Sequence, residues 1–397
     1  MRAVMLLLVA LSVGSMSASA QKKEPDGPSD NGSDPACVIK DITRAPDGLV
    51  VWSPTGDEFI VNKKDAGGTY QLYVGSDKKQ PVCITCVERQ NGPLANRHKL
   101  QPHWHPSGRW IELAGEREKH SKPILVTSKV VEGLVQSGLW VDIYLTRPDG
   151  SQWYRLKSFS GGQGGDGFTG VAFTPNGKQA VWAQIVGNAF PFGRWELILA
   201  DFVEDSHGVP SFTNQRNITP KGATWVETGN FAPDGKSLLI SADIGIRDAQ
   251  GMDQYILDVT TGGVRNLTNS PNLWDEHGRF SPDGRKILYM SSFPFKSNPF
   301  RHNTLLLHTE FMLMNSDGSG QHQITHFNWS DYPESNARGR GSVAANGEWR
   351  PDGRAISVLN LFFPIYETWT IAFNGSCGGD VRVRSGDPSK RPTGDKP

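Results

Sequence analysis

Short stretches of alternating hydrophobic and polar residues follow one another along most of the chain, each bounded by glycine, proline, asparagine or aspartate. Lys286–Ser291 (KILYMS) and Lys236–Ser241 (KSLLIS) are two examples. Such alternation is typical of strands with one buried face, and the bounding residues are those of tight turns. No helical period separates the stretches. The pattern therefore predicts an all-β protein built from short strands.

One five-residue motif, aromatic-x-Pro-x-Gly, recurs along the chain. Its proline presets the first corner of a turn and its glycine takes the position with positive φ. Each copy therefore predicts a hairpin between an inner strand, which ends at the aromatic residue, and a second strand. The six copies are Trp52–Gly56, Trp104–Gly108, Phe173–Gly177, Phe231–Gly235, Phe280–Gly284 and Trp349–Gly353.

A second hairpin follows in most units. Tyr255–Thr268 reads as a strand, a turn and a strand that ends in Leu-Thr, and Phe311–Thr325 repeats it with the ending Ile-Thr. Gln71–Thr85 and Ile143–Leu156 are looser copies. Four strands per unit are typical of a propeller blade, whereas a solenoid would have shorter and more uniform repeats. We predict a six-bladed β-propeller of four-stranded antiparallel blades.

The segment Phe280–Ser291 (FSPDGRKILYMS), with the strand ending Asn266–Thr268, resembles the WD40-like repeat of TolB-type propellers. The resemblance recurs in all six units and covers residues 44–375. It implies a six-bladed propeller. TolB carries a separate α/β domain ahead of its propeller, and only a short linker precedes Thr43 here, so a Tol–Pal role is not implied. Similar propellers occur in binding proteins, in prolyl-oligopeptidase-like peptidases and in oligogalacturonate lyases.

The two ends of the repeat region are expected to complete one blade together. Cys37–Thr43 ends like the outer strands elsewhere, so it could supply the outer strand of the sixth blade. The third strand of that blade is then Thr368–Phe373. A competing assignment makes Asp380–Arg384 (DVRVR) the outer strand.

The chain has four cysteines, which permit three disulfide connectivities. In an exported protein, disulfides are expected before metal or redox chemistry. Cys83 and Cys86 have C-x-x-C spacing in a segment that reads as strand, which favours a short structural bridge over a redox centre. Cys37 and Cys377 would lie at the same end of the sixth blade, so a bridge between them fits the predicted closure.

Composition and the first residues indicate an exported protein. The chain has 41 Lys+Arg and 41 Asp+Glu, and this balance removes the broad attraction to nucleic acid or an anionic membrane. Residues 1–20 combine a basic start, a short apolar run and a small-residue cleavage site, which predicts a signal peptide. A linker at 21–36, a propeller at 37–385 and a disordered tail at 386–397 are expected to follow. We expect a periplasmic or secreted monomer without a membrane span.

The candidate site lies where the inner strands begin, because residues there line the central channel of a propeller. Long insertions at 116–141, 292–310 and 327–347 belong to the same rim, and variable loops often carry function. Trp225, Trp274 and Trp329 flank these loops and could stack on a ligand, although packing is the simpler interpretation. The candidate ligand-binding residues are Gln101, His103, Glu227, Trp274, Glu276, His277 and Asn346.

Two functional classes follow from these residues. The sequence has no G-x-S-x-G and no H-E-x-x-H motif. The first hypothesis is therefore a binding or protein-interaction scaffold for an envelope or extracellular protein, or for a saccharide or peptide ligand, and it needs no cofactor. The alternative is a metal-assisted carbohydrate-active enzyme, lyase or hydrolase. Its divalent metal ion would be held by His103, Glu276 and His277, since imidazole and carboxylate suit such ions and acid–base work.

Overall fold

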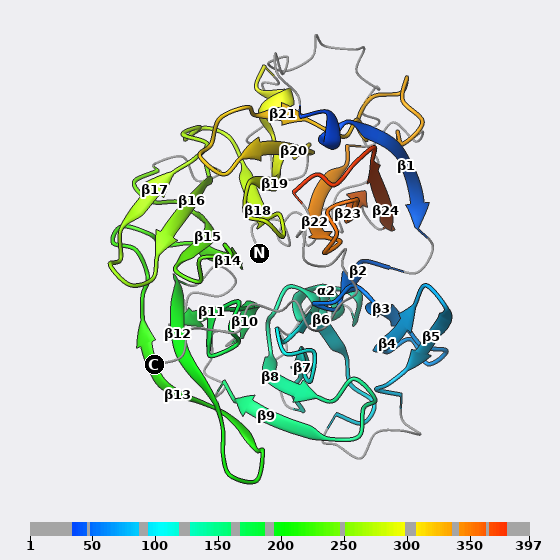
Figure 1. Ribbon diagram of the computed structural model, residues 1–397, viewed down its shortest axis with the longest axis vertical. Helices are drawn as coiled ribbons and strands as arrows, with labels where there is room; N and C mark the ends of the chain where they lie inside the picture. Colours follow the sequence, from blue (N-terminus) through cyan, green and yellow to red (C-terminus); the bar gives the residue numbers. More distant parts are fainter. Residues whose placement is uncertain are drawn as a thin grey trace, which may run out of the picture.

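The computed structural model describes residues 34–45, 48–86, 94–118, 128–159, 167–186, 194–246, 251–297, 307–335, 341–362 and 365–378. Within these residues, the strands form six antiparallel sheets of four strands each. The sheets stand as blades around a common axis, and the first strand of the repeat unit faces the axis in each (Figure 1). The predicted six-bladed β-propeller is therefore confirmed.

The blades follow one another in chain order. Blade 1 consists of β2 (Val50–Trp52), β3 (Phe59–Lys64), β4 (Tyr70–Ser76) and β5 (Lys79–Cys83), and blade 2 consists of β6 (Lys99–Trp104), β7 (Ile111–Glu116), β8 (Val141–Thr146) and β9 (Trp153–Lys157). Blade 3 consists of β10 (Phe168–Phe173), β11 (Gln179–Val186), β12 (Arg194–Glu204) and β13 (Pro210–Asn217), and blade 4 consists of β14 (Val226–Phe231), β15 (Ser237–Ala242), β16 (Asp253–Asp258) and β17 (Val264–Asn266). Blade 5 consists of β18 (Asp275–Phe280), β19 (Lys286–Ser291), β20 (Glu310–Asn315) and β21 (His322–Gln323), and blade 6 consists of β22 (Val343–Trp349), β23 (Ala355–Phe362), β24 (Ile365–Phe373) and β1 (Ile39–Ala45). The helical elements are η1 (Pro35–Cys37), α2 (Ser128–Gln136) and η3 (Phe293–Phe295).

Blade 6 takes its strands from both ends of the described chain. β1 pairs antiparallel with β24, and Ile42 lies opposite Ile371 in this register. The N-terminal strand is therefore the outer strand of the last blade, as expected, and it closes the ring (Figure 1). The competing strand Asp380–Arg384 lies outside the described residues.

Both expected disulfides are present. Cys37 is bonded to Cys377, immediately beside the β1–β24 pair, and the two residues are separated by 340 positions in the sequence. Cys83 is bonded to Cys86, three positions away. The first bond therefore ties the two ends of the ring together, whereas the second is local to blade 1.

The Leu-Thr and Ile-Thr endings of the repeat have a structural reason. In four blades a threonine after the outer strand accepts a hydrogen bond at its Oγ1 from a backbone N–H at the start of the third strand. In three of these blades the threonine hydroxyl also donates to the buried side chain of the residue just before that N–H donor. The threonine therefore links the outer strand to the third strand by two hydrogen bonds. The threonines are Thr85, Thr219, Thr268 and Thr325, and the acceptors of the second bond are Gln71, Asp253 and Glu310.

The Pro-x-Gly turns hold neighbouring blades together at one end of the ring. Gly284 has φ 74°, and a β-carbon placed on it would lie 2.6 Å from Cδ of Pro233 in the preceding blade. A β-carbon on Gly56 of blade 1 would lie 3.7 Å from Pro351 of blade 6. The turns therefore follow one another around the ring and across its closure. Glycine at Gly284 is required by both the positive φ and the close approach.

Helix α2 was not expected, because its insertion was interpreted as a loop. Its residues Leu134 and Val135 are buried in the core that blades 2, 3 and 4 share. The backbone carbonyl of Gln136, at its last position, accepts a hydrogen bond of 2.8 Å from Nε2 of Gln101 on β6. The helix is thus fixed beside the inner strand of blade 2 (Figure 1).

We predict that the Cys37–Cys377 bond carries much of the stability of the ring. Replacing both cysteines with serine should lower the free energy of unfolding by about 6 kcal/mol in the chain-entropy estimate, because the bond closes a very long loop. The matched control, serine at Cys83 and Cys86, should cost about 2 kcal/mol because its loop is short. Urea unfolding without reductant measures both. Equal losses in the two variants would contradict the prediction.

The threonine link can be tested at Thr325, which is fully buried. Its Oγ1 lies 2.6 Å from Oε2 of Glu310 and 2.9 Å from N of Phe311. Thr325→Val keeps the shape but removes both bonds, so the free energy of unfolding should fall by about 2–3 kcal/mol. Thr213→Val, at an exposed position on β13, should change it by less than about 0.5 kcal/mol. A similar small effect at both positions would show that the link does not stabilise the blade.

Candidate functional site

The inner strands surround a cavity of about 780 Å³. Residues from all six blades line it, which places it on the axis of the ring. The candidate residues on its wall are Gln101, His103, Glu227, Glu276, His277 and Asn346. Apolar residues make up much of the remaining wall, among them Leu49, Val51, Leu100, Met290, Leu359 and Leu361. The structure thus brings the polar residues that open the inner strands into one chamber.

A break in strand register turns these side chains toward the axis. The pairing of the first strand with the second shifts in five blades, and the residues skipped lie one to four positions before the motif's aromatic residue. Gln101 and His277 lie at such shifts with φ of 49° and 56°, which is uncommon for residues other than glycine. A bulge of this kind re-aims a side chain out of the regular alternation. The sequence alternation alone does not show it.

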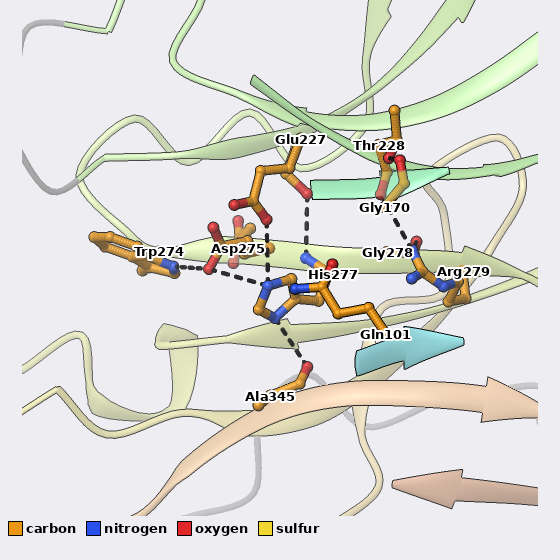
Figure 2. A network of polar contacts seen from close by, with 12 residues as sticks. Gln101, Gly170, Glu227, Thr228, Trp274, Asp275, His277, Gly278, Arg279 and Ala345 are labelled. Carbon is orange, nitrogen blue, oxygen red and sulfur yellow. Dashed lines mark hydrogen bonds and ion pairs between the residues drawn. The ribbon is translucent and has the colours of Figure 1, made fainter. Parts of the chain in front are cut away.

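His277 lies against two carboxylates at the cavity wall, and Figure 2 shows its contact with Glu227. Its Nε2 is 3.3 Å from Oε2 of Glu227 and 3.8 Å from Oε2 of Glu276. The two glutamates occupy equivalent positions in β14 and β18, the inner strands of blades 4 and 5. Their side chains are 10% and 2% exposed, and that of His277 is 21% exposed. We call these three residues the carboxylate–imidazole group.

Two neighbours orient the carboxylate–imidazole group. Nδ1 of His277 donates to the backbone carbonyl of Ala345 in blade 6 at 3.0 Å. Because a carbonyl only accepts, Nδ1 carries the hydrogen and Nε2 is the atom presented to the carboxylates. Nε1 of Trp274 donates to Oε2 of Glu276 at 2.8 Å. Side chains from two blades and a carbonyl from a third therefore meet at one point.

Burial and mutual contact shift the pKa values of the group in different directions. Burial raises the pKa of Glu276, and the neighbouring Glu227 adds to this rise. Burial also acts to raise the pKa of Glu227, but its hydrogen bond and charge contact with His277 outweigh burial and lower it. Burial would lower the pKa of His277, whereas Glu276 and Glu227 together raise it above its usual value. The group is therefore a tightly coupled ionic set.

The tryptophans do not offer rings to a ligand. Trp225, Trp274 and Trp329 are buried. Their burial agrees with packing, the simpler interpretation from the sequence, rather than with the stacking role. Trp274 has a further part, because its N–H orients the carboxylate of Glu276. Strand position alone did not reveal this contact.

His103 lies on the same cavity but apart from His277. Its Nδ1 is 3.2 Å from Oε2 of Glu112 on β7, and Glu112 is fully buried. Among the described residues, the set whose ligand atoms lie close enough to share a metal ion is Glu227, Glu276 and His277. His103 therefore does not join the metal ligands that the sequence suggested.

A second polar layer accompanies His103 and was missed in the sequence. Nε of Arg279 is 3.2 Å from Oε1 of Glu348, and both residues line the cavity. His103, Arg279 and Glu348 each stand directly before the aromatic residue of the motif, whereas His277 stands three positions before it. The number of residues between a side chain and the motif's aromatic residue could have predicted this layer, because that number sets the level of the side chain along the channel.

No protein-family model and no curated protein matches the chain. Among solved structures, a TolB candidate from Agrobacterium tumefaciens is 18% identical, with 76% of this chain and 82% of that chain covered and a TM-score of 0.46. An oligogalacturonate lyase from Vibrio parahaemolyticus is 10% identical, with 84% and 95% covered and a TM-score of 0.47. A puromycin hydrolase is 15% identical, with 83% and 45% covered and a TM-score of 0.46. The propeller fold stands on the strand pairing above, and these likenesses assign no activity.

The His103–Glu112 pair gives a test that depends on pH. Burial raises the pKa of Glu112 above its ordinary value of 4.5, while the hydrogen bond and charge of His103 oppose the rise. His103→Leu removes this opposition. The folded protein then holds the Glu112 proton more tightly than the unfolded chain does, so stability falls as pH rises above 4.5.

We therefore expect His103→Leu to lower the free energy of unfolding by about 2–4 kcal/mol at pH 8 and by less at pH 5. Urea unfolding at the two pH values measures this. His207→Leu, at the exposed tip of the β12–β13 hairpin, is the matched control and should show no pH-dependent difference from the parent protein. A loss of equal size at both pH values would contradict the assignment of Glu112 as the responsible group.

Proposed function

We propose that this protein is a binding propeller of the periplasm or the extracellular space, whose central cavity takes a saccharide or peptide ligand. The observation that carries the proposal is the carboxylate–imidazole group, held rigidly on the wall of a largely apolar cavity. Ligand sites typically combine such an apolar chamber with a few convergent polar groups, and their volumes are about 300–1,000 Å³. The cavity of about 780 Å³ falls in this range.

The charges of the cavity favour a particular ligand chemistry. Glu227 and Glu276 place two carboxylates against one imidazole, so the group is acidic or neutral rather than basic. Such a group accepts hydrogen bonds from hydroxyl and amino groups. Apolar neighbours such as Leu100 and Met290 would pack against the rest of the ligand. Sugars and short peptides carry both features.

The disulfides support the proposed compartment. Bonds such as Cys37–Cys377 form and persist in oxidising surroundings outside the cytoplasm. The expected signal peptide at 1–20 lies outside the described residues. Within the described part of the chain, none of the helices has the length and apolar character needed to cross a bilayer.

Filling part of the cavity should weaken binding. Asn346→Trp places a large ring on the cavity wall, and we expect it to weaken binding of any ligand found in a panel of oligosaccharides and short peptides by at least tenfold. Thr213→Trp, at an exposed position on β13, should leave affinity unchanged. Thermal-shift screening followed by calorimetry measures both. Equal affinity of Asn346→Trp and the parent protein would show that the ligand binds elsewhere.

The same panel separates binding from the carbohydrate-active alternative. The specific observation that favours the enzyme is the imidazole of His277 between two carboxylates, a set able to do acid–base work on a bound sugar. Mass spectrometry after incubation should show intact oligosaccharides if the protein only binds them. Cleavage that disappears in His277→Gln would overturn the pure binding function in favour of the enzyme.

A further inference from the structure

The carboxylate–imidazole group has the spacing of a metal site. The ligand atoms of Glu227, Glu276 and His277 all lie within 4.8 Å of one another, and Nε2 of His277 is 3.3 and 3.8 Å from the two carboxylate oxygens. Around a tetrahedral ion with bonds of about 2.0–2.1 Å, neighbouring ligand atoms lie about 3.4 Å apart. The two distances from Nε2 of His277 lie close to this value, so modest side-chain adjustment, mainly of the two carboxylates toward each other, would seat an ion between the three side chains.

The charge of the group calls for a cation. Two carboxylates that are at most 10% exposed face one imidazole. When both carboxylates are ionised, a positively charged imidazole balances only one of them, and a buried charge without a partner is costly. The nearby guanidinium of Arg279 is already paired with Glu348 at 3.2 Å, and it also donates to the backbone carbonyls of Thr228 and Gly278. A bound divalent ion would supply the missing positive charge.

The neighbours of the group act as outer-sphere partners do in metal sites. Metal-binding histidines usually donate their second ring N–H to a carbonyl or carboxylate, which fixes the tautomer. Nδ1 of His277 does this toward Ala345, and the N–H of Trp274 orients the carboxylate of Glu276. All three ligand residues also line the cavity. Metal sites with three protein ligands and one open coordination position can bind a further ligand at that position.

We propose that Glu227, Glu276 and His277 hold one divalent transition-metal ion, whose remaining coordination position faces the cavity. One nitrogen and two carboxylate donors suit ions such as Mn²⁺ and Zn²⁺ better than Ca²⁺, which takes oxygen ligands. The inference deepens the proposed function and rests on it in one respect: the cavity ligand would complete the coordination of the ion. Binding of the ion itself does not require that ligand.

Calorimetry of the full chain, stripped with chelator and titrated with Mn²⁺ and then with Zn²⁺, tests the site. We expect one ion per chain, and at least tenfold weaker binding in Glu276→Gln and in His277→Gln. Trp274→Phe leaves the ligands in place but removes the bond that orients Glu276, so it should weaken binding by about 10–100-fold and change the electron paramagnetic resonance spectrum of bound Mn²⁺. Glu367→Gln, which lines the same cavity and pairs with Arg44, should bind as the parent protein does.

Absence of binding in the parent protein, or equal affinity in all variants, would overturn the metal site. If the glutamine variants fail to fold, crystals of the parent protein soaked with Mn²⁺ decide the question, because the ion must then lie between the three side chains. An ion found elsewhere, or none, overturns the inference. If the metal does not bind but a ligand does, and Asn346→Trp weakens binding of that ligand, the proposed binding function would stand without the metal site. Metal binding without any cavity ligand would support the site and remove that function.

Discussion

Closure of the ring is the constraint on which the rest of the structure depends. Each blade packs its two faces only against its two neighbours, so an open ring would expose one apolar face on the first blade and one on the last. β1 prevents this by pairing with β24, and the Cys37–Cys377 bond holds the same junction covalently. The central cavity exists only because the inner strands are held in a full circle by this junction.

The fold could be predicted from the sequence because its information is local and repeated. Each Pro-x-Gly turn specifies a hairpin by itself, and Gly284 shows why the glycine is needed at both the turn and the contact between blades. The threonines of the Leu-Thr and Ile-Thr endings mark the ends of outer strands in the sequence. The hydrogen bonds of Thr325 with Glu310 and Phe311 explain why threonine occurs there. Closure followed from the same marking, since the segment after Cys37 ends as an outer strand does.

The site was only partly predictable, because its geometry depends on contacts between distant residues. Strand starts predicted which residues face the channel, but not their level along it. His277 and His103 differ in distance from the motif's aromatic residue, and they meet different partners. The bulge that gives His277 a positive φ has no signature in the alternation. Helix α2 was missed because a nine-residue amphipathic segment inside one insertion leaves no repeated pattern to detect.

The position of the site relates its occupancy to the integrity of the ring. Glu227 comes from blade 4, Glu276 and His277 from blade 5, and the carbonyl of Ala345 from blade 6. A ligand or ion at this point contacts or orients groups of three consecutive blades, which have the required spacing only in the closed ring. Anything that binds the closed form alone adds its binding free energy to the stability of that form. Closure at blade 6 and occupancy of the cavity therefore stabilise each other, although the residues responsible lie far apart in the sequence.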